Sequence, residues 1–197
     1  MTQFEPLLRQ LSQPVTPQTE VDYETAAISL GQAGGIALPV IEQLLTASEA
    51  DIRFWGVRSL WANGSEAAQA RLINVLADAD EMVRSGAALA LGELQVIAAI
   101  PDLLTLLADD PTAAGDHAAD ALSKMGPPAA ASLIPLLSDD RPHVRLRAAK
   151  ALIPLESHAA IRPLIHCLDH DSSYLVRHYA DQALKRMGVG EMIYFKP

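Results

Sequence analysis

One stretch of the chain decides the fold, residues 81–110, which reads EMVRSGAALALGELQVIAAIPDLLTLLADD. Apolar residues recur at helical spacing in its first half, up to Leu94, and again in its second half, with a short break near Gln95. Pro101 suits the first turn of the second helix, because an N–H at that position has no intrahelical partner to lose. The stretch therefore predicts a pair of helices, which we term the A helix and the B helix.

The helix pair repeats along the chain at a nearly constant period. A leucine of the A helix and a leucine of the B helix each return every 30 to 32 residues. The A-helix series is Leu30, Leu60, Leu91, Leu122, Leu152 and Leu184, and the B-helix series is Leu45, Leu76, Leu107, Leu137 and Leu168. Such self-similarity is typical of solenoids, in which each unit buries its apolar face against its neighbours. We therefore expect an all-α fold, a right-handed α-solenoid of the armadillo type with about five to six helix-pair repeats.

The composition excludes several classes of function. The chain has 197 residues, half of them hydrophobic, and a formal net charge of −9. Proteins that bind nucleic acid or anionic lipid non-specifically need a basic surface, so neither partner is expected. Cys167 is the one cysteine, which excludes an internal disulfide framework, and the N-terminal residues carry no signal-peptide pattern. No apolar run approaches the ~20 residues of a membrane span, and we expect a cytoplasmic protein.

Charged residues recur at the turns between repeats. An aspartate precedes successive A helices at Asp80, Asp110, Asp140 and Asp171, where N-capping is the expected role. An arginine follows inside the A helix at Arg53, Arg84, Arg145 and Arg177. We interpret this ladder as structural, with hydrogen bonds exchanged between neighbouring repeats, rather than as a binding site. Gly115 interrupts the arginine series, and its A helix is expected to start late, near Asp116; a hinge, a docking notch and simple drift remain open explanations.

The repeat unit resembles a known family. The A helix VRSGAALALG (residues 83–92) and the B helix IPDLLTLL (residues 100–107) look like those of HEAT repeats. More narrowly, they resemble the short HEAT-like repeats named after phycobilisome (PBS) lyases. We expect a single HEAT-like repeat domain over residues 1–197, with an N-terminal capping helix and linker in 1–20, repeats in 22–188 and an apolar tail in 189–197.

Stacked B helices of such solenoids normally line the concave face, which is the candidate partner-binding surface. Positions two and five residues before the B-helix leucine should point outward there. The candidate contacts are Gln43, Arg71, Asn74, Asp102, Thr105 and His166, and the same positions hold Val40, Ser132, Pro135 and Pro163 in other repeats. This strip is mostly uncharged and suits a helix or an extended peptide, although a merely solvated face is the alternative.

Two aromatic groups are further candidates for partner binding. Trp55 and Trp61 lie six residues apart on one A helix, where they either fill the core, the interpretation we favour, or form an interaction hot spot. Tyr194 and Phe195 lie in the apolar C-terminal tail, which either folds back as a cap or docks on another chain.

The sequence contains no catalytic constellation. It lacks a phosphate-binding glycine loop, a GxSxG elbow and the paired His–Glu motifs of HEAT-repeat di-iron hydroxylases. His166 and His170 are four residues apart, but the B helix is expected to end near Leu168 with His170 in the turn. No separate ligand cluster with metal-site spacing supports the pair, so no metal site is predicted. Cys167 should face the core as an inert thiol. We expect no cofactor and no catalytic residue.

Two functions remain in competition. The first is a non-catalytic scaffold that binds a protein partner through its concave face or its C-terminal tail. The alternative, which the resemblance implies, is a phycobilin lyase subunit or bilin-handling chaperone that attaches a tetrapyrrole to a phycobiliprotein cysteine. Arg71 or Arg145 would then meet the bilin propionates and Asp102 the pyrrole N–H groups. The resemblance also implies a bacterial protein and a heterodimer with another HEAT-like chain, while a homodimer through the tail is a further possibility. A DNA glycosylase built from such repeats is disfavoured by the net charge of −9.

Overall fold

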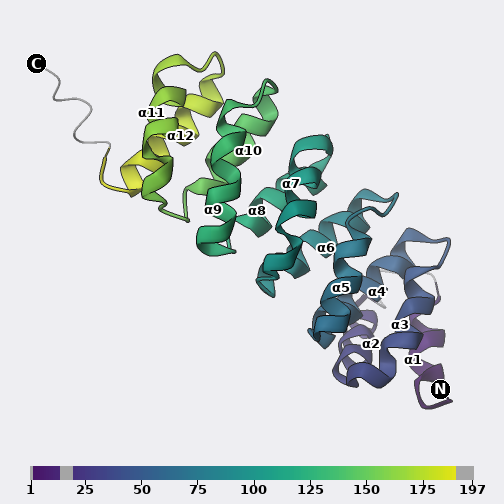
Figure 1. Ribbon diagram of the computed structural model, residues 1–197. Helices are drawn as coiled ribbons and strands as arrows, with labels where there is room; N and C mark the ends of the chain where they lie inside the picture. Colours follow the sequence, from purple (N-terminus) through teal and green to yellow (C-terminus); the bar gives the residue numbers. More distant parts are fainter. Residues whose placement is uncertain (1, 14–19, 190–197) are drawn as a thin grey trace, which may run out of the picture. The chain divides into compact units, whose positions relative to one another are not determined.

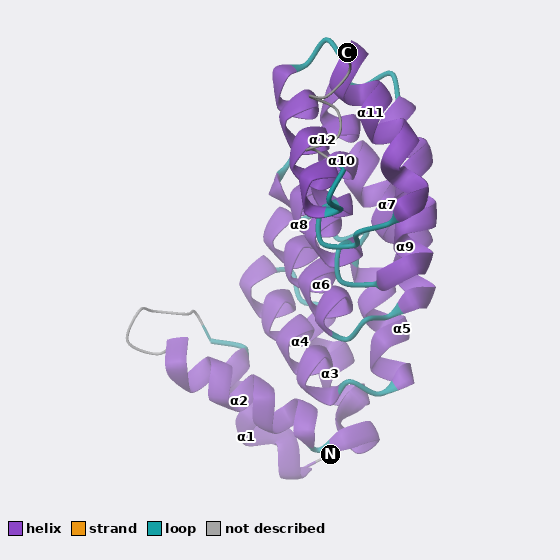
Figure 2. Cartoon of the chain, turned by 90° about the vertical axis from the view of Figure 1, so that its left-hand side faces the viewer, coloured by secondary structure: helices purple, strands orange, loops and turns teal. Residues whose placement is uncertain are grey.

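The computed structural model describes residues 2–13 and 20–189, and these contain helices, turns and loops but no strand (Figure 2). The expected all-α fold is therefore confirmed for the described chain. The predicted tail residues Tyr194 and Phe195 lie outside the described residues. The chain divides into two compact units, Met1–Leu94 and Gln95–Pro197.

The N-terminal unit is built from two rows of helices (Figure 1). Its helices are α1 (Glu5–Leu11), α2 (Glu20–Gln32), α3 (Leu38–Leu45), α4 (Ala50–Asn63), α5 (Glu66–Val75) and α6 (Glu81–Glu93), with the 3-10 helices η1 (Thr2–Phe4) and η2 (Gly34–Ala37). The A helices α2, α4 and α6 pack side by side, while the B helices α3 and α5 both contact α4. Helix α1 packs on α2 and α3.

The C-terminal unit continues the pattern. Its helices are α7 (Ile100–Asp109), α8 (Ala113–Leu122), α9 (Gly126–Leu133), α10 (Pro142–Leu152), α11 (Ile161–His170) and α12 (Tyr174–Arg186), with the 3-10 helices η3 (Ile97–Ala99), η4 (Ile134–Ser138) and η5 (His158–Ala160). The A helices α8, α10 and α12 form one row, and the B helices are α7, the α9–η4 segment and α11. Helix α9 gives way to η4 at Pro135, because a proline has no N–H for the α-helical hydrogen bond.

The A-helix leucines form the centre of the core. All six, from Leu30 to Leu184, are at most 1% exposed. Burial of one such side chain contributes about 1.5–3 kcal/mol relative to leaving it in water. In the B-helix series Leu76, Leu107 and Leu137 are buried, while Leu45 and Leu168 are half-buried. The period read from the sequence thus identifies the residues that hold each unit together.

The aspartates at the turns are only partly helix caps. Asp80 caps α6 as predicted, because its carboxylate accepts hydrogen bonds from the N–H groups of Met82 (2.8 Å) and Val83 (3.3 Å). The capping prediction is wrong for Asp110, Asp140 and Asp171. The N-cap positions of those helices belong to Thr112, Arg141 and Ser173.

An aspartate two residues before the N-cap instead closes four of these turns. Its carboxylate accepts a hydrogen bond from the N–H of the N-cap residue, which is the geometry of an Asx turn. The four pairs are Asp78–Asp80 (2.9 Å), Asp110–Thr112 (2.8 Å), Asp139–Arg141 (2.9 Å) and Asp171–Ser173 (2.8 Å). The side chain therefore fixes the direction in which the next A helix leaves the turn.

The irregular repeat at Gly115 starts on time rather than late. Helix α8 begins at Ala113, and the Thr112 hydroxyl accepts a hydrogen bond from the N–H of Ala114, so the expected start near Asp116 is wrong. In the regular repeats an arginine at the position of Gly115 donates to carbonyls of the preceding turn. The turn before α8 has no such arginine of its own.

Arg147, from the following A helix, takes over this role. Its Nη1 donates to the carbonyls of Leu107 (2.8 Å) and Asp110 (2.7 Å), and its Nη2 donates to that of Thr112 (3.0 Å). The residue is only 6% exposed, and a Cβ on Gly115 would lie 2.2 Å from its Nη1. The glycine therefore provides the space in which a neighbouring repeat supplies the missing guanidinium.

Within residues 2–13 and 20–189, no single helix has the length and apolar character of a membrane span. Only the pair Glu20–Gln32 and Gly34–Leu45, bent by 119°, meets those two criteria together.

Replacing Gly115 by alanine should lower the free energy of unfolding by about 2–4 kcal/mol, because the new Cβ would push a buried guanidinium off its carbonyl partners. Urea denaturation followed by circular dichroism measures this change. Gly35→Ala is the matched control, since a Cβ there meets nothing within 4 Å, and it should change the stability by less than about 1 kcal/mol. Equal stabilities of the two variants would contradict the role given to Arg147.

Candidate partner-binding surface

The residues two positions before each B-helix leucine share one position of the repeat in both units, and we call this set of residues the outward row. They are Gln43 on α3, Asn74 on α5, Thr105 on α7, Pro135 on η4 and His166 on α11, and all five are exposed. Two residues correspond to about 200° around an α-helix, so these side chains lie opposite the buried leucine. The expected outward direction is therefore confirmed within each unit, while binding by these residues stays a prediction.

The residues five positions before the leucine are less uniform. Asp102 is exposed and Arg71 is half-buried, but Val40 is only 4% exposed, so its expected outward position is wrong. Ser132 and Pro163 are half-buried. Five residues correspond to about 140° from the buried leucine on the helix surface, so this position lies at the flank, where neighbouring side chains decide burial.

The polar side chains at these positions differ in whether they already form hydrogen bonds within the chain. Arg71 donates from Nε to a carboxylate oxygen of Glu42 at 2.7 Å and from Nη1 to the carbonyl of Ala67 at 2.8 Å. Within the described part of the chain, the amide side chains of Gln43 and Asn74 form no hydrogen bonds. These two amides are therefore available to donate to, and accept from, a partner.

The two tryptophans of α4 have different surroundings. Trp55 is 6% exposed and packs against the rings of Tyr23 and Phe54, each with a centroid distance of 5.6 Å, so its predicted place in the core is confirmed. Trp61 does not fill the core. It is half-buried, lines a small pocket of about 210 Å³, and has the guanidinium of Arg58 lying 4.5 Å over its ring.

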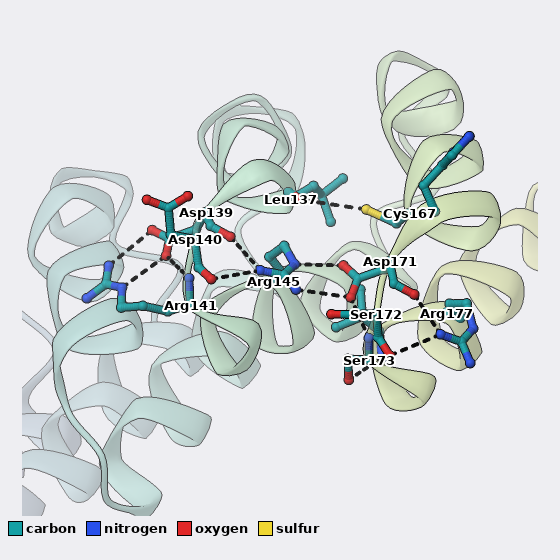
Figure 3. Close-up of polar contacts among 12 residues, drawn as sticks. Leu137, Asp139, Asp140, Arg141, Arg145, Cys167, Asp171, Ser172, Ser173 and Arg177 are labelled. Carbon is teal, nitrogen blue, oxygen red and sulfur yellow. Dashed lines mark hydrogen bonds and ion pairs between the residues drawn. The ribbon is translucent and has the colours of Figure 1, made fainter.

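A larger pocket of about 480 Å³ lies at the C-terminal ends of η4 and α11. Figure 3 shows Arg145 between the Asp139–Asp140 turn and Asp171. Arg145 donates from Nε and Nη2 to the two carboxylate oxygens of Asp171 at 2.6 and 3.0 Å. Its Nη1 donates to the carbonyls of Asp139 (2.7 Å) and Asp140 (3.0 Å). One guanidinium thus joins two successive turns.

These hydrogen bonds keep the pocket carboxylates ionised. The guanidinium of Arg145 lowers the pKa of Asp171 below its usual value, and further hydrogen bonding from the N–H of Ser173 acts in the same direction. Hydrogen bonds from the side chain and the N–H of Arg141 lower the pKa of Asp139 to about 2. Both aspartates are therefore anionic at neutral pH.

The same bidentate pair occurs in the N-terminal unit, which supports the structural interpretation of the ladder. Arg53 donates to both carboxylate oxygens of Asp78 at 2.8 Å and to the carbonyls of Ala47 and Ser48. The exchange of hydrogen bonds between repeats is therefore confirmed. Arg71 and Arg145, the two arginines considered for bilin propionates, both have a carboxylate partner already.

Cys167 contributes an inert surface to the larger pocket. Its side chain is 3% exposed with Sγ 3.5 Å from the carbonyl oxygen of Leu137, and burial raises the pKa of the thiol. The expected buried thiol is confirmed. Across the described ranges, no group of three or more His, Cys, Asp or Glu side chains is arranged to hold a metal ion.

A family model described as HEAT repeats matches residues 36–115 and 113–185 of the chain. Among solved structures, the complex of CpcE and CpcF of phycocyanin lyase from Nostoc sp. PCC7120 is similar with a TM-score of 0.53 and 23% identity, over 94% of this chain and 77% of that chain. A designed armadillo repeat protein in complex with the peptide (KR)4 is similar with a TM-score of 0.52 and 20% identity, over 92% and 98% of the two chains. An engineered protein is similar with a TM-score of 0.51 and 21% identity, over 96% of this chain and 98% of that chain.

At these identities the structural likeness shows the fold alone, and it agrees with the solenoid expected from the leucine period. No curated protein is significantly similar to the chain in sequence.

Asp171→Asn should destabilise the protein at neutral pH by about 2–4 kcal/mol, because Arg145 loses the charge of its partner. The pKa of Asp171 is lowered in the folded state, so its contribution is complete above the unfolded value and disappears as the pH falls through the folded value. The difference between wild type and variant should therefore shrink below about pH 4, which urea denaturation at several pH values would measure.

Asp102→Asn is the matched control for this pH experiment. Asp102 is exposed and makes no ion pair among the described residues, so its replacement should change the free energy of unfolding by less than about 1 kcal/mol. A wild-type-like pH profile for Asp171→Asn would show that the ion pair with Arg145 is not what stabilises the turn.

Proposed function

The chain belongs to the HEAT-repeat family. We propose that it is a non-catalytic scaffold that binds a protein partner through the outward-row residues of its units. Its repeats resemble those of phycobilisome lyases. In this proposal the protein acts in the cytoplasm, and the C-terminal tail with Tyr194 and Phe195 supplies a second contact.

The outward row is the observation that carries the proposal. Each B helix presents one exposed residue at the same register, and these residues are small or medium-sized and mostly uncharged. In the C-terminal unit, successive B helices are in contact, α7 with α9 and η4 with α11. Packed helices lie about 8–10 Å apart, and an extended peptide advances about 3.3 Å per residue. One repeat therefore corresponds to about three residues of a bound peptide. Free amides such as those of Gln43 and Asn74 suit the backbone groups of such a peptide.

The comparisons support this use of the fold without identifying the partner. The designed armadillo repeat protein is an all-α solenoid in complex with a peptide, and CpcE is in complex with CpcF. These are properties of those proteins. For this chain they support protein partners, including a second HEAT-like chain, as the class to test.

The alternative is a phycobilin lyase subunit or bilin-handling chaperone. The likeness to the CpcE–CpcF complex supports it through the fold. Against it, Glu42 and Asp171 already neutralise Arg71 and Arg145, which leaves those two arginines poorly suited to bind propionates. A titration with free phycocyanobilin separates the two functions, since a saturable, stoichiometric change in visible absorption would favour the lyase and an unchanged spectrum is expected of the scaffold.

Placing arginine at two positions of the outward row, Asn74→Arg with Thr105→Arg, should reduce partner binding at least about tenfold while the protein stays folded. Bulky charges there would occupy the space of the partner, and loss of about 1.4 kcal/mol per tenfold is the scale of one good contact. Affinity capture from source-cell lysate with quantitative mass spectrometry, followed by titration of the purified partner, measures the effect.

Thr25→Arg with Gln182→Arg is the matched control, because both residues are exposed on A helices and gain the same charge. This control should bind the partner as the wild type does. A second arm lacking residues 191–197 tests the tail, and sedimentation of each protein reports homodimers. Binding that survives both the outward-row change and the tail deletion would show that the proposed surfaces are wrong.

A further inference from the structure

His166 and His170 lie on one face of a continuous helix. The sequence predicted that the B helix ends near Leu168 with His170 in the turn, and this is wrong, because α11 runs from Ile161 to His170. The two imidazole rings stack with a centroid distance of 4.8 Å and an interplanar angle of 23°. Both side chains are exposed and both line the 480 Å³ pocket. The placement of His170 in the turn is therefore no argument against a ligand shared by the two rings, although no third side chain of the described residues joins them.

A hydrogen bond to the backbone fixes which nitrogen of His170 is free. The Nδ1 of His170 lies 3.3 Å from the carbonyl oxygen of His166, and a carbonyl can only accept, so Nδ1 carries the proton. The lone pair is then on Nε2. Metal-binding histidines commonly donate their other N–H to a backbone carbonyl in this way, which orients the ring and fixes its tautomer. Among the described residues, nothing forms a hydrogen bond with the ring nitrogens of His166.

The electrostatic surroundings of the pair favour a cation. The pocket is lined by Asp139, Asp140 and Asp171. Asp139 pairs with Arg141 and Asp171 pairs with Arg145, so Asp140 is the lining carboxylate that has no arginine partner among the described residues. His170 is also the last residue of α11, where the helix dipole places negative partial charge. A cation is therefore attracted to this end of the helix.

We propose that His166 and His170 form a two-histidine chelate for a divalent late transition metal of the Zn²⁺, Ni²⁺ and Cu²⁺ class. Imidazole nitrogen suits these ions at about 2.0–2.1 Å, whereas Mg²⁺ and Ca²⁺ prefer oxygen ligands. Both rings are exposed, and rotation of the side chains out of the stacked arrangement would bring their free nitrogens to one ion. Cys167 points into the core and Asp171 is held by Arg145, so the remaining coordination positions belong to water or to a ligand from a docked protein.

Isothermal titration of the full chain without a histidine tag, with NiCl₂ or ZnCl₂ at pH 7.5, tests the proposal. One site of micromolar affinity is expected, and His166→Ala or His170→Ala should each weaken it at least about tenfold. Binding should also weaken on acidification, because the metal and protons compete for the same lone pairs. His158→Ala is the control, since it removes an exposed histidine of the same unit and should leave the affinity unchanged.

No uptake of Ni²⁺ or Zn²⁺ by the wild type at millimolar concentration would exclude the site. Wild-type affinity in the His166→Ala, His170→Ala double variant would place the metal elsewhere on the chain. His170→Gln keeps the side-chain size and removes the chelating imidazole, so a loss of binding in that variant with an unchanged circular dichroism spectrum separates chelation from misfolding.

Discussion

The arrangement of the repeats depends on one interaction, the hydrogen bonds from an arginine to the backbone carbonyls of the turn between a B helix and the next A helix. Carbonyls of a turn have no partner in a helix, and those that are shielded from water must find a donor elsewhere. Arg53, Arg84, Arg145 and Arg177 each donate from Nη1 to the carbonyls five and six residues earlier. The requirement belongs to the turn rather than to one position in the sequence, since Arg147 meets it from the next repeat where Gly115 cannot.

The parts of the fold that the sequence predicts are those that follow from a period. The leucine series identifies the helix pairs and the buried face, because residues buried at fixed spacing give a periodic pattern of apolar residues. The hydrogen bonds of the turns give no periodic pattern in the sequence. Adjacent aspartates such as Asp139 and Asp140 are alike in sequence, and only geometry shows that Asp139 accepts the hydrogen bond of the Asx turn. Arg147 acts 32 residues beyond Gly115, outside any regular register.

The sequence predicts the candidate surface only where a position follows from the helical period. The outward row follows from the angle between a buried leucine and the residue two positions earlier, and all five members are exposed. Positions at the flank, such as Val40, depend on neighbouring side chains that the spacing does not reveal. The predicted end of the B helix that carries the two histidines is about two residues too early. No proline or glycine near Leu168 marks the helix end, and α11 continues to His170.

The exchange between Gly115 and Arg147 has a consequence for how such a chain can change in length. Solenoids usually gain or lose whole repeats, since each repeat contacts only its neighbours and similar repeats can be stacked in any number. Here the repeat of α8 lacks the arginine for its own turn, and Arg147 of α10 supplies the guanidinium instead. The repeats of α8 and α10 therefore depend on each other. A duplication, deletion or graft that separates them would leave the turn before α8 without its guanidinium, so the two repeats must be moved together.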